Sequence, residues 1–163
     1  MRTKARAAQT FVIVFFGLAC QHSENRYLHR TVQPAELVGR WMGTPFAMES
    51  LRYAGYKTHL DAKEHRLLLN ADGSCRAETV VNPSEASPDG AGAWVSASMP
   101  CRWRLGTDGE HQTLELMVSA ASGGDRRLSF YFDEEDGGIT LWQFAGDPDA
   151  WKYMEFRKST GAG

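Results

Sequence analysis

Two cysteines near the middle of the chain are the residues whose chemistry the sequence defines best. Side chains alternate between the two faces of a strand, so Cys75 shares the apolar face of the run 74–81 and Cys101 that of the run 95–105. An antiparallel hairpin turning near residues 88–90 would place the two directly opposite each other. Opposed residues have Cα atoms about 4.5 to 5.5 Å apart, which suits a disulfide. We predict a Cys75–Cys101 disulfide, with two unpaired core thiols as the alternative.

The same hairpin makes two further predictions about register. With Cys75 opposite Cys101, continuous pairing would put Val81 opposite Val95. Pro100 has no backbone N–H to donate to the ladder. We therefore expect a bulge or an interruption beside Cys101.

The sequence offers no other recognisable reactive group. The histidines are scattered, and no pair has the His-Glu-x-x-His spacing of a zinc site; they are His22, His29, His59, His65 and His111. There is no Gly-x-Ser-x-Gly elbow and no glycine-rich phosphate loop. The acidic run 133–138 lacks the alternating ligands of a calcium loop and is typical of a solvated hairpin turn. We expect no catalytic residue, no metal and no cofactor, and thus not an enzyme.

The elements that must position the cysteines are strands. Paired turn residues recur at short, regular intervals, at 72–73, 89–90, 108–109, 123–124, 137–138 and 146–149. Runs of alternating apolar residues lie between them, for example 113–118 and 128–132. This spacing predicts an all-β sandwich or barrel. A short helix is expected somewhere in residues 44–55.

Charge and length restrict the function further. Residues 1–19 hold three basic and no acidic residues, so 15 Lys and Arg remain against 20 Asp and Glu. A net negative chain argues against nucleic acid as a partner, because phosphate binding depends on clustered cations. The remaining residues suffice for one domain with a single core.

The first twenty residues resemble a bacterial lipoprotein signal. Three basic residues precede the apolar run 11–16, and small residues lead to Cys20; this is the pattern of a secretory signal. The resemblance implies that residues 1–19 are removed and that Cys20 is acylated. Gln21 resembles the following residue of cargo sent to the periplasmic side of the outer membrane. A plain secretory signal with a free cysteine is the alternative. Residues 20–34 are polar and unpatterned and predict a flexible tether.

The two ends of the domain, 35–159, resemble those of lipocalin-like barrels. The domain opens with Gly39-Arg40-Trp41 and closes with Arg157, and residues 160–163 are expected to form a disordered tail. The resemblance implies an antiparallel up-and-down barrel of about eight strands. In it, Gly39 and Trp41 would close one end, and Arg157 would lie over the indole. An ordinary core tryptophan and a surface arginine are the alternative.

The C-terminal stretch, from Leu141-Trp142-Gln143-Phe144 to Glu155-Phe156, resembles the ending of small bacterial lipoproteins of unassigned role. That resemblance implies a location in the cell envelope and no particular activity.

Two binding functions follow as expectations. An eight-stranded barrel can hold one small ligand, and Met99, Leu116 and Phe130 would line its cavity. In this first hypothesis, the partners are the membrane, through the lipid, and a small hydrophobic molecule. In the second, these side chains fill the barrel, and the protein binds an envelope protein through loops and rim. Trp94, Trp142 and Trp151 are the rim candidates.

Overall fold

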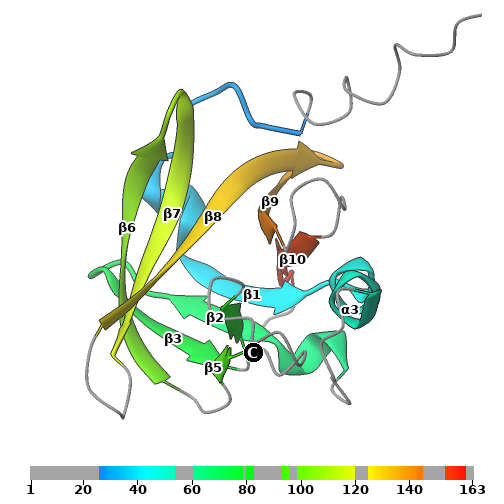
Figure 1. Cartoon of the computed structure of the whole chain (residues 1–163). Helices are drawn as coiled ribbons and strands as arrows, with labels where there is room; N and C mark the ends of the chain where they lie inside the picture. Colours follow the sequence, from blue (N-terminus) through cyan, green and yellow to red (C-terminus); the bar gives the residue numbers. More distant parts are fainter. Residues whose placement is uncertain are drawn as a thin grey trace, which may run out of the picture.

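Eight antiparallel strands close into a barrel in the order β1-β10-β9-β8-β7-β6-β3-β2 (Figure 1). The computed structural model describes residues 26–53, 61–78, 80–82, 93–95, 99–119, 125–144 and 153–160. Barrel strands that follow one another along the chain are neighbours in the sheet, and the first strand pairs with the last. The predicted up-and-down antiparallel barrel is therefore confirmed.

The strands differ in length and are joined by short helices. The barrel strands are β1 (Gly39–Gly43), β2 (Arg66–Leu69), β3 (Ser74–Glu78), β6 (Met99–Asp108), β7 (His111–Ser119), β8 (Asp125–Glu135), β9 (Gly138–Phe144) and β10 (Tyr153–Lys158). A separate two-stranded sheet pairs β4 (Val80–Asn82) with β5 (Ala93–Val95). The helices are α2 (Pro34–Leu37), α3 (Pro45–Tyr53) and the 3-10 turn η1 (Ala62–Glu64). The helix expected within residues 44–55 is α3.

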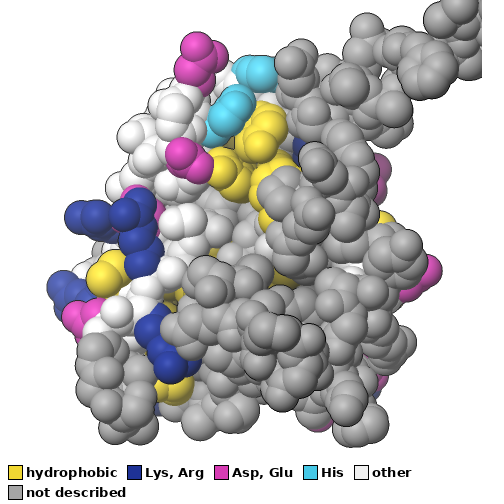
Figure 2. All heavy atoms as spheres, in the orientation of Figure 1, with side chains coloured by type: hydrophobic (Ala, Val, Ile, Leu, Met, Phe, Trp, Pro, Cys, Tyr) yellow, Lys and Arg dark blue, Asp and Glu magenta, His cyan; other side chains and the backbone are white. Residues whose placement is uncertain are grey.

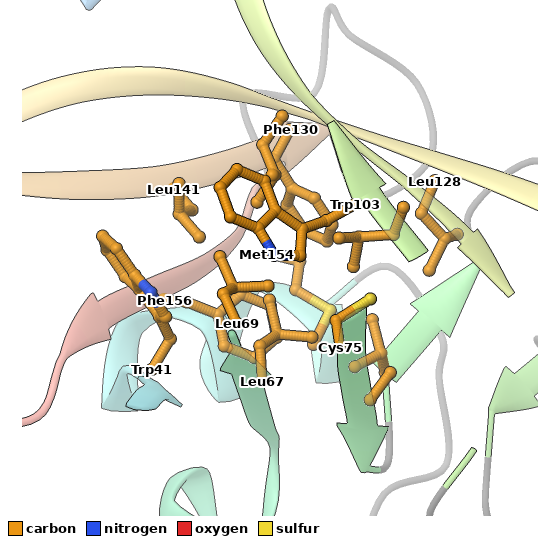
Figure 3. Packing of buried hydrophobic residues seen from close by; sticks show 14 of the residues in the cluster. Trp41, Leu67, Leu69, Cys75, Trp103, Leu128, Phe130, Leu141, Met154 and Phe156 are labelled. Carbon is orange, nitrogen blue, oxygen red and sulfur yellow. The ribbon is translucent and has the colours of Figure 1, made fainter. Parts of the chain in front are cut away.

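The apolar face of each strand points into the barrel. Figure 3 shows side chains from several strands meeting there, among them Trp41, Phe130 and Phe156. The rings of Phe130 and Phe156 pack edge to face, with centroids 5.7 Å apart. An eight-stranded barrel is just wide enough for its own side chains to fill the interior, and these residues belong to one buried cluster.

Helices lie at both ends of β1. Helix α2 precedes this strand, and its buried Leu37 joins the core cluster. Helix α3 follows the strand, begins after Thr44, and buries Ala47 and Met48 in the same cluster. The Thr44 hydroxyl accepts a hydrogen bond from the Ala47 N–H (3.1 Å), as a capping residue does.

The N-terminal strap, residues 26–33, packs against the barrel. Val32 is buried in the core cluster. Its N–H donates to the Gln112 side chain (2.7 Å), which donates back to the Val32 carbonyl (3.1 Å). The Leu28 N–H donates to the Phe132 carbonyl (2.9 Å). The predicted tether covered residues 20–34; of these, the structure places 26–33 against the barrel, with bonds from Leu28 and Val32, and Pro34 at the start of α2. Residues 20–25 lie outside the described part.

Strands β3 and β6 confirm the disulfide and correct the register. Cys75 pairs with Cys101 at a Cα separation of 4.8 Å, and their sulfurs are bonded. The register runs without a bulge from Ser74–Arg102 to Ala77–Met99, through Pro100, so no interruption lies beside Cys101. Instead β4 and β5 pair Val80, not Val81, with Val95. The one-residue shift falls between the two pairings. The predicted turn at 88–90 lies outside the described residues.

Candidate functional site

The residues expected to line a ligand cavity belong to the packed interior or its edge. Leu116 and Phe130 are completely buried in the core cluster, and Met99 packs against that cluster as a partly buried neighbour. The three hollows described along the outer surface are lined by other residues. These three residues therefore pack within the hydrophobic core or against it, and they do not line a cavity among those described.

Trp41, expected to close one end of the barrel, is buried in the core, and its cationic partner is Lys158. Trp41 is fully buried, and its indole N–H donates to the Leu37 carbonyl (2.8 Å). Lys158 pairs with Trp41 across β1 and β10, so its side chain shares the same face. The ammonium lies 5.9 Å from the indole centroid and donates to the Glu36 carbonyl (2.8 Å). Such a contact contributes about 0.5 to 1 kcal/mol when exposed.

Our expectation for Arg157 is therefore wrong. Arg157 has the opposite parity to Phe156, which points inward, so its guanidinium lies on the outer face. There it pairs with Glu135 and with Glu155. Gly39 leaves room for Lys158: its φ is +136°, and a Cβ there would lie 2.9 Å from the Lys158 Cε. A residue with a side chain would displace the lysine from the tryptophan.

Four aromatic residues cover the outside of β8, β9 and β10. We call this group the aromatic wall; its members are Tyr131, Trp142, Phe144 and Tyr153. Neighbouring rings lie 4.9 to 5.5 Å apart between centroids. Although it faces outward, Trp142 is only 1% exposed. Figure 2 shows hydrophobic side chains close to the histidines at the top of one side of the molecule.

Arg26 of the strap is held against the aromatic wall. Its guanidinium carbon lies 4.3 Å from the Tyr153 ring centroid and 5.2 Å from that of Trp142. The guanidinium also pairs with the buried carboxylate of Glu155 and lies 3.6 Å from that of Asp133. A desolvated carboxylate needs such a partner, because an unpaired buried charge is strongly destabilising. The strap thus supplies the closer of two counter-charges for Glu155, the other being Arg157 of β10 at 3.7 Å.

Tyr27, next in the strap, extends this contact toward the β6–β7 turn. Its ring stacks on His111 at 3.7 Å and meets Tyr131 edge-on at 5.1 Å. Burial raises the pKa of Tyr131, and so does the hydrogen bond that its hydroxyl donates to the Asp108 carboxylate. Burial, followed by the charge of Asp108, raises the pKa of Tyr27. Burial also raises the pKa of Tyr153, while Arg26 acts in the opposite direction. All three phenols therefore stay neutral across the physiological range.

A second outward carboxylate is neutralised within the barrel itself. Glu115 of β7 is buried between Arg104 of β6 and Arg127 of β8, with a 2.7 Å contact to the Arg104 Nε. Gly106 leaves room for it, since a Cβ there would lie 2.3 Å from the Glu115 Oε1. The Glu115 carboxylate is therefore neutralised by two arginines of the same sheet, and it is not free to bind a ligand.

The opposite wall, on β1, β2, β3 and β6, is cationic. We call it the arginine face; it consists of Arg40, Arg66, Arg76 and Arg102 around Leu68. All five side chains are exposed, and Leu68 is 38% exposed. Register pairs Arg40 with Leu68 and Leu68 with Arg76 on neighbouring strands. A hollow of about 470 Å³ lies here, lined in part by Arg40, Arg66 and Arg76.

Sequence reasoning identified neither outer surface as a site. The signal was the alternation itself: Arg76 and Arg102 have the parity opposite to the buried cysteines, and so face out. On β9 apolar residues occur at both parities, Leu141 on one face and Trp142 and Phe144 on the other, which is typical of a strand covered on both faces. That pattern indicated that another segment covers the wall, without naming the strap.

The described residues hold no cluster of three or more His, Cys, Asp or Glu that could bind a metal ion. Within the same ranges, no helix is long and apolar enough to cross a bilayer. Cys20, Trp151 and the side chain of Trp94 lie outside the described part of the chain. Of the three rim candidates, Trp142 is described, and it lies within the aromatic wall.

The fold and its disulfide define a class: a closed, eight-stranded, up-and-down antiparallel β-barrel. Comparison with protein-family models, with curated proteins and with solved structures found no match. The resemblance to bacterial lipoproteins and to lipocalin-like proteins as families thus stays a prediction.

Proposed function

We propose that the protein is a lipid-anchored module of the cell envelope, not an enzyme, that binds another protein at its outer surface. The observation that carries the proposal is the occupied interior: Leu116 and Phe130, fully buried, pack where a ligand would have to lie. Because side chains fill the interior of the barrel, a partner would have to bind at its outer surface. This is the second of the two binding functions expected from the sequence.

The anchor is the acylated Cys20 that the leader predicts. A single acyl chain binds a membrane only marginally, whereas two or more hold firmly, at about 0.8 kcal/mol per buried methylene. The Cys75–Cys101 disulfide supports an oxidising compartment outside the cytoplasm. Metabolic labelling with an alkyne fatty acid tests the anchor. We expect label on the wild type and on Cys75→Ala, and none on Cys20→Ala.

A small hydrophobic ligand is the competing function. It would need a site such as the hollow of about 500 Å³ beside Trp41, which is lined by Glu36, Glu135 and Lys158 among others. Charged groups around a small apolar molecule would lose hydration without gaining partners. This argues for protein binding over carriage of an apolar molecule.

Native mass spectrometry of the purified mature protein, paired with a cavity variant, separates the two functions. We expect a mass equal to polypeptide plus acyl groups. We also expect an environment-sensitive apolar dye to bind Leu116→Ala, in which truncation opens a cavity, and not the wild type. A stoichiometric apolar molecule in the wild type, or equal dye binding by both proteins, would overturn the proposal.

A further inference from the structure

We propose that the arginine face is the docking site, and that its partner is an acidic protein segment carrying an apolar side chain. This inference rests on the proposed function and specifies its surface. The centres of the arginine face and of the aromatic wall lie on opposite sides of the barrel, because in the closed order β2 is four strands from β8 and β3 is four strands from β9. The strap therefore leaves the arginine face uncovered.

The arginine face has more positive charge than its neighbours neutralise. Arg66 lies 3.9 Å from Glu78, and its Nε donates to the Lys63 carbonyl. Asp72 is the acidic group whose charge interacts with Arg102. Within the described residues, neither Arg40 nor Arg76 has a carboxylate partner. The surface is thus complementary to an anionic partner, although the mature chain as a whole is acidic.

The exposed apolar centre favours a protein over a simple polyanion. Leu68 lies between Arg40 and Arg76 in one cross-strand row, which continues to Pro100. Protein interfaces are enriched in arginine and place apolar contacts at their centre, within a polar rim. The barrel is closed, so the partner cannot add a strand to an edge here. Recognition must use side chains.

The length of the tether excludes the anchoring membrane as the occupant. From Cys20 to Arg26 there are six residues, which span at most about 20 Å. Strand spacing and tilt make the barrel with its side chains roughly 25 Å across, and the path around it roughly 40 Å. With Arg26 fixed on the aromatic wall, the lipid cannot reach a membrane that touches the arginine face. This face is therefore turned away from the anchoring membrane.

A second copy of the chain is also a poor occupant. The most acidic stretch of the described residues is 133–136, at the end of β8 and its turn, and three of its four carboxylates already have partners. Asp133 pairs with Arg26, Glu134 with Arg30 and Glu135 with Arg157. Docking this turn on another barrel would break these pairs. The charge complementarity thus points to a different protein.

The test uses the full lipidated protein in detergent and a fluorescein-labelled peptide of eight residues, glutamate throughout except for leucine at positions 3 and 6. Fluorescence anisotropy measures its binding to the wild type, Arg76→Glu and Leu68→Ser. The matched control is Arg30→Glu, which makes the same charge change at an exposed site outside the arginine face. Thermal unfolding verifies that every variant is folded.

We expect Arg76→Glu to weaken peptide binding by about tenfold or more, since like charges now face each other, and Arg30→Glu to change it less than about twofold. Leu68→Ser should weaken the binding of this peptide, but not the binding of a peptide in which serine replaces both leucines. Equal affinity of wild type and Arg76→Glu, equal losses in both charge variants, or self-association that Arg76→Glu abolishes would overturn the inference. An apolar molecule found inside the barrel would instead overturn the proposed function. The peptide-binding result would not depend on that finding, so the two failures can be told apart.

Discussion

The aromatic wall and the arginine face are two parts of one barrel surface, and they differ in what covers them. Trp142 and Glu155 point outward, yet both are buried, because Arg26 and Tyr27 of the strap lie on them. Arg40, Leu68 and Arg76 also point outward and stay exposed. Outward direction on a barrel therefore does not decide burial. On the aromatic wall, a segment outside the sheet decides it.

The difference separates stability from recognition. Groups on the aromatic wall are desolvated and paired within the chain, so their loss should unfold the protein. Groups on the arginine face make few contacts with their own chain, so their loss should leave the fold intact and change binding. The following experiments test this contrast.

The largest effect is expected from truncating the aromatic wall. Trp142→Ala should lower the free energy of unfolding by about 4 kcal/mol, as is usual for a buried aromatic residue. Leu68→Ala is the matched control on the arginine face and should stay within about 0.5 kcal/mol. Urea denaturation followed by circular dichroism measures both. Similar losses in the two variants would remove the contrast.

Breaking the disulfide should have the next largest effect. Cys75 and Cys101 are separated by 26 residues, and the chain-entropy model gives such a crosslink about 3.5 kcal/mol. We expect Cys75→Ala/Cys101→Ala to lower the urea midpoint accordingly, with acylation at Cys20 unaffected. An unchanged midpoint would mean that the crosslink adds nothing to this hairpin.

Removing the guanidinium of the strap sharpens the comparison. Arg26→Ala leaves the Glu155 carboxylate buried without its main partner and should cost about 3 kcal/mol. Arg30→Ala removes a more exposed guanidinium and should cost less than about 1 kcal/mol. Glu155→Gln combined with Arg26→Ala should recover part of the loss. If the two single variants lose equal stability, the strap is not a structural clamp.

The smallest effect concerns pH. The pKa of Tyr131 is raised in the folded protein, so the folded state holds this proton more tightly than the unfolded state. Its contribution to stability is complete below the unfolded pKa of about 10 and is lost as pH rises above it. We expect the urea midpoint to fall as the pH rises above about 10, and that of Tyr131→Phe to fall less steeply. Parallel pH profiles would contradict the assignment.

The alternation of apolar and polar residues predicted much of this structure from the sequence. It assigns each side chain to a face of its strand, but it does not identify the segment that covers that face. A period of two places Cys75 and Cys101 on one face, and their register then follows from pairing. The same rule, applied to β10, assigns Lys158 and not Arg157 to the face of Trp41. We carried the arginine over from a resemblance, and that residue proved wrong.

The strap could not be predicted in the same way. Arg26, Tyr27 and Val32 each contact a different group on the barrel, and no repeat in the sequence connects them. The shift that pairs Val80 with Val95 is also local. Alternation predicts that each arginine of the arginine face points outward from its own strand. The four arginines form one surface only because β1, β2, β3 and β6 are neighbours in the barrel.

The orientation of the barrel on the proposed anchoring membrane tests the central claim most directly. The claim is that the strap, by fixing Arg26 on the aromatic wall, keeps the arginine face away from that membrane. A fluorophore attached at His29→Cys or Leu68→Cys, both exposed positions, can be quenched by spin-labelled lipids in vesicles carrying the lipidated protein. The account predicts strong quenching at residue 29 and little at residue 68. Equal or stronger quenching at residue 68 would contradict it.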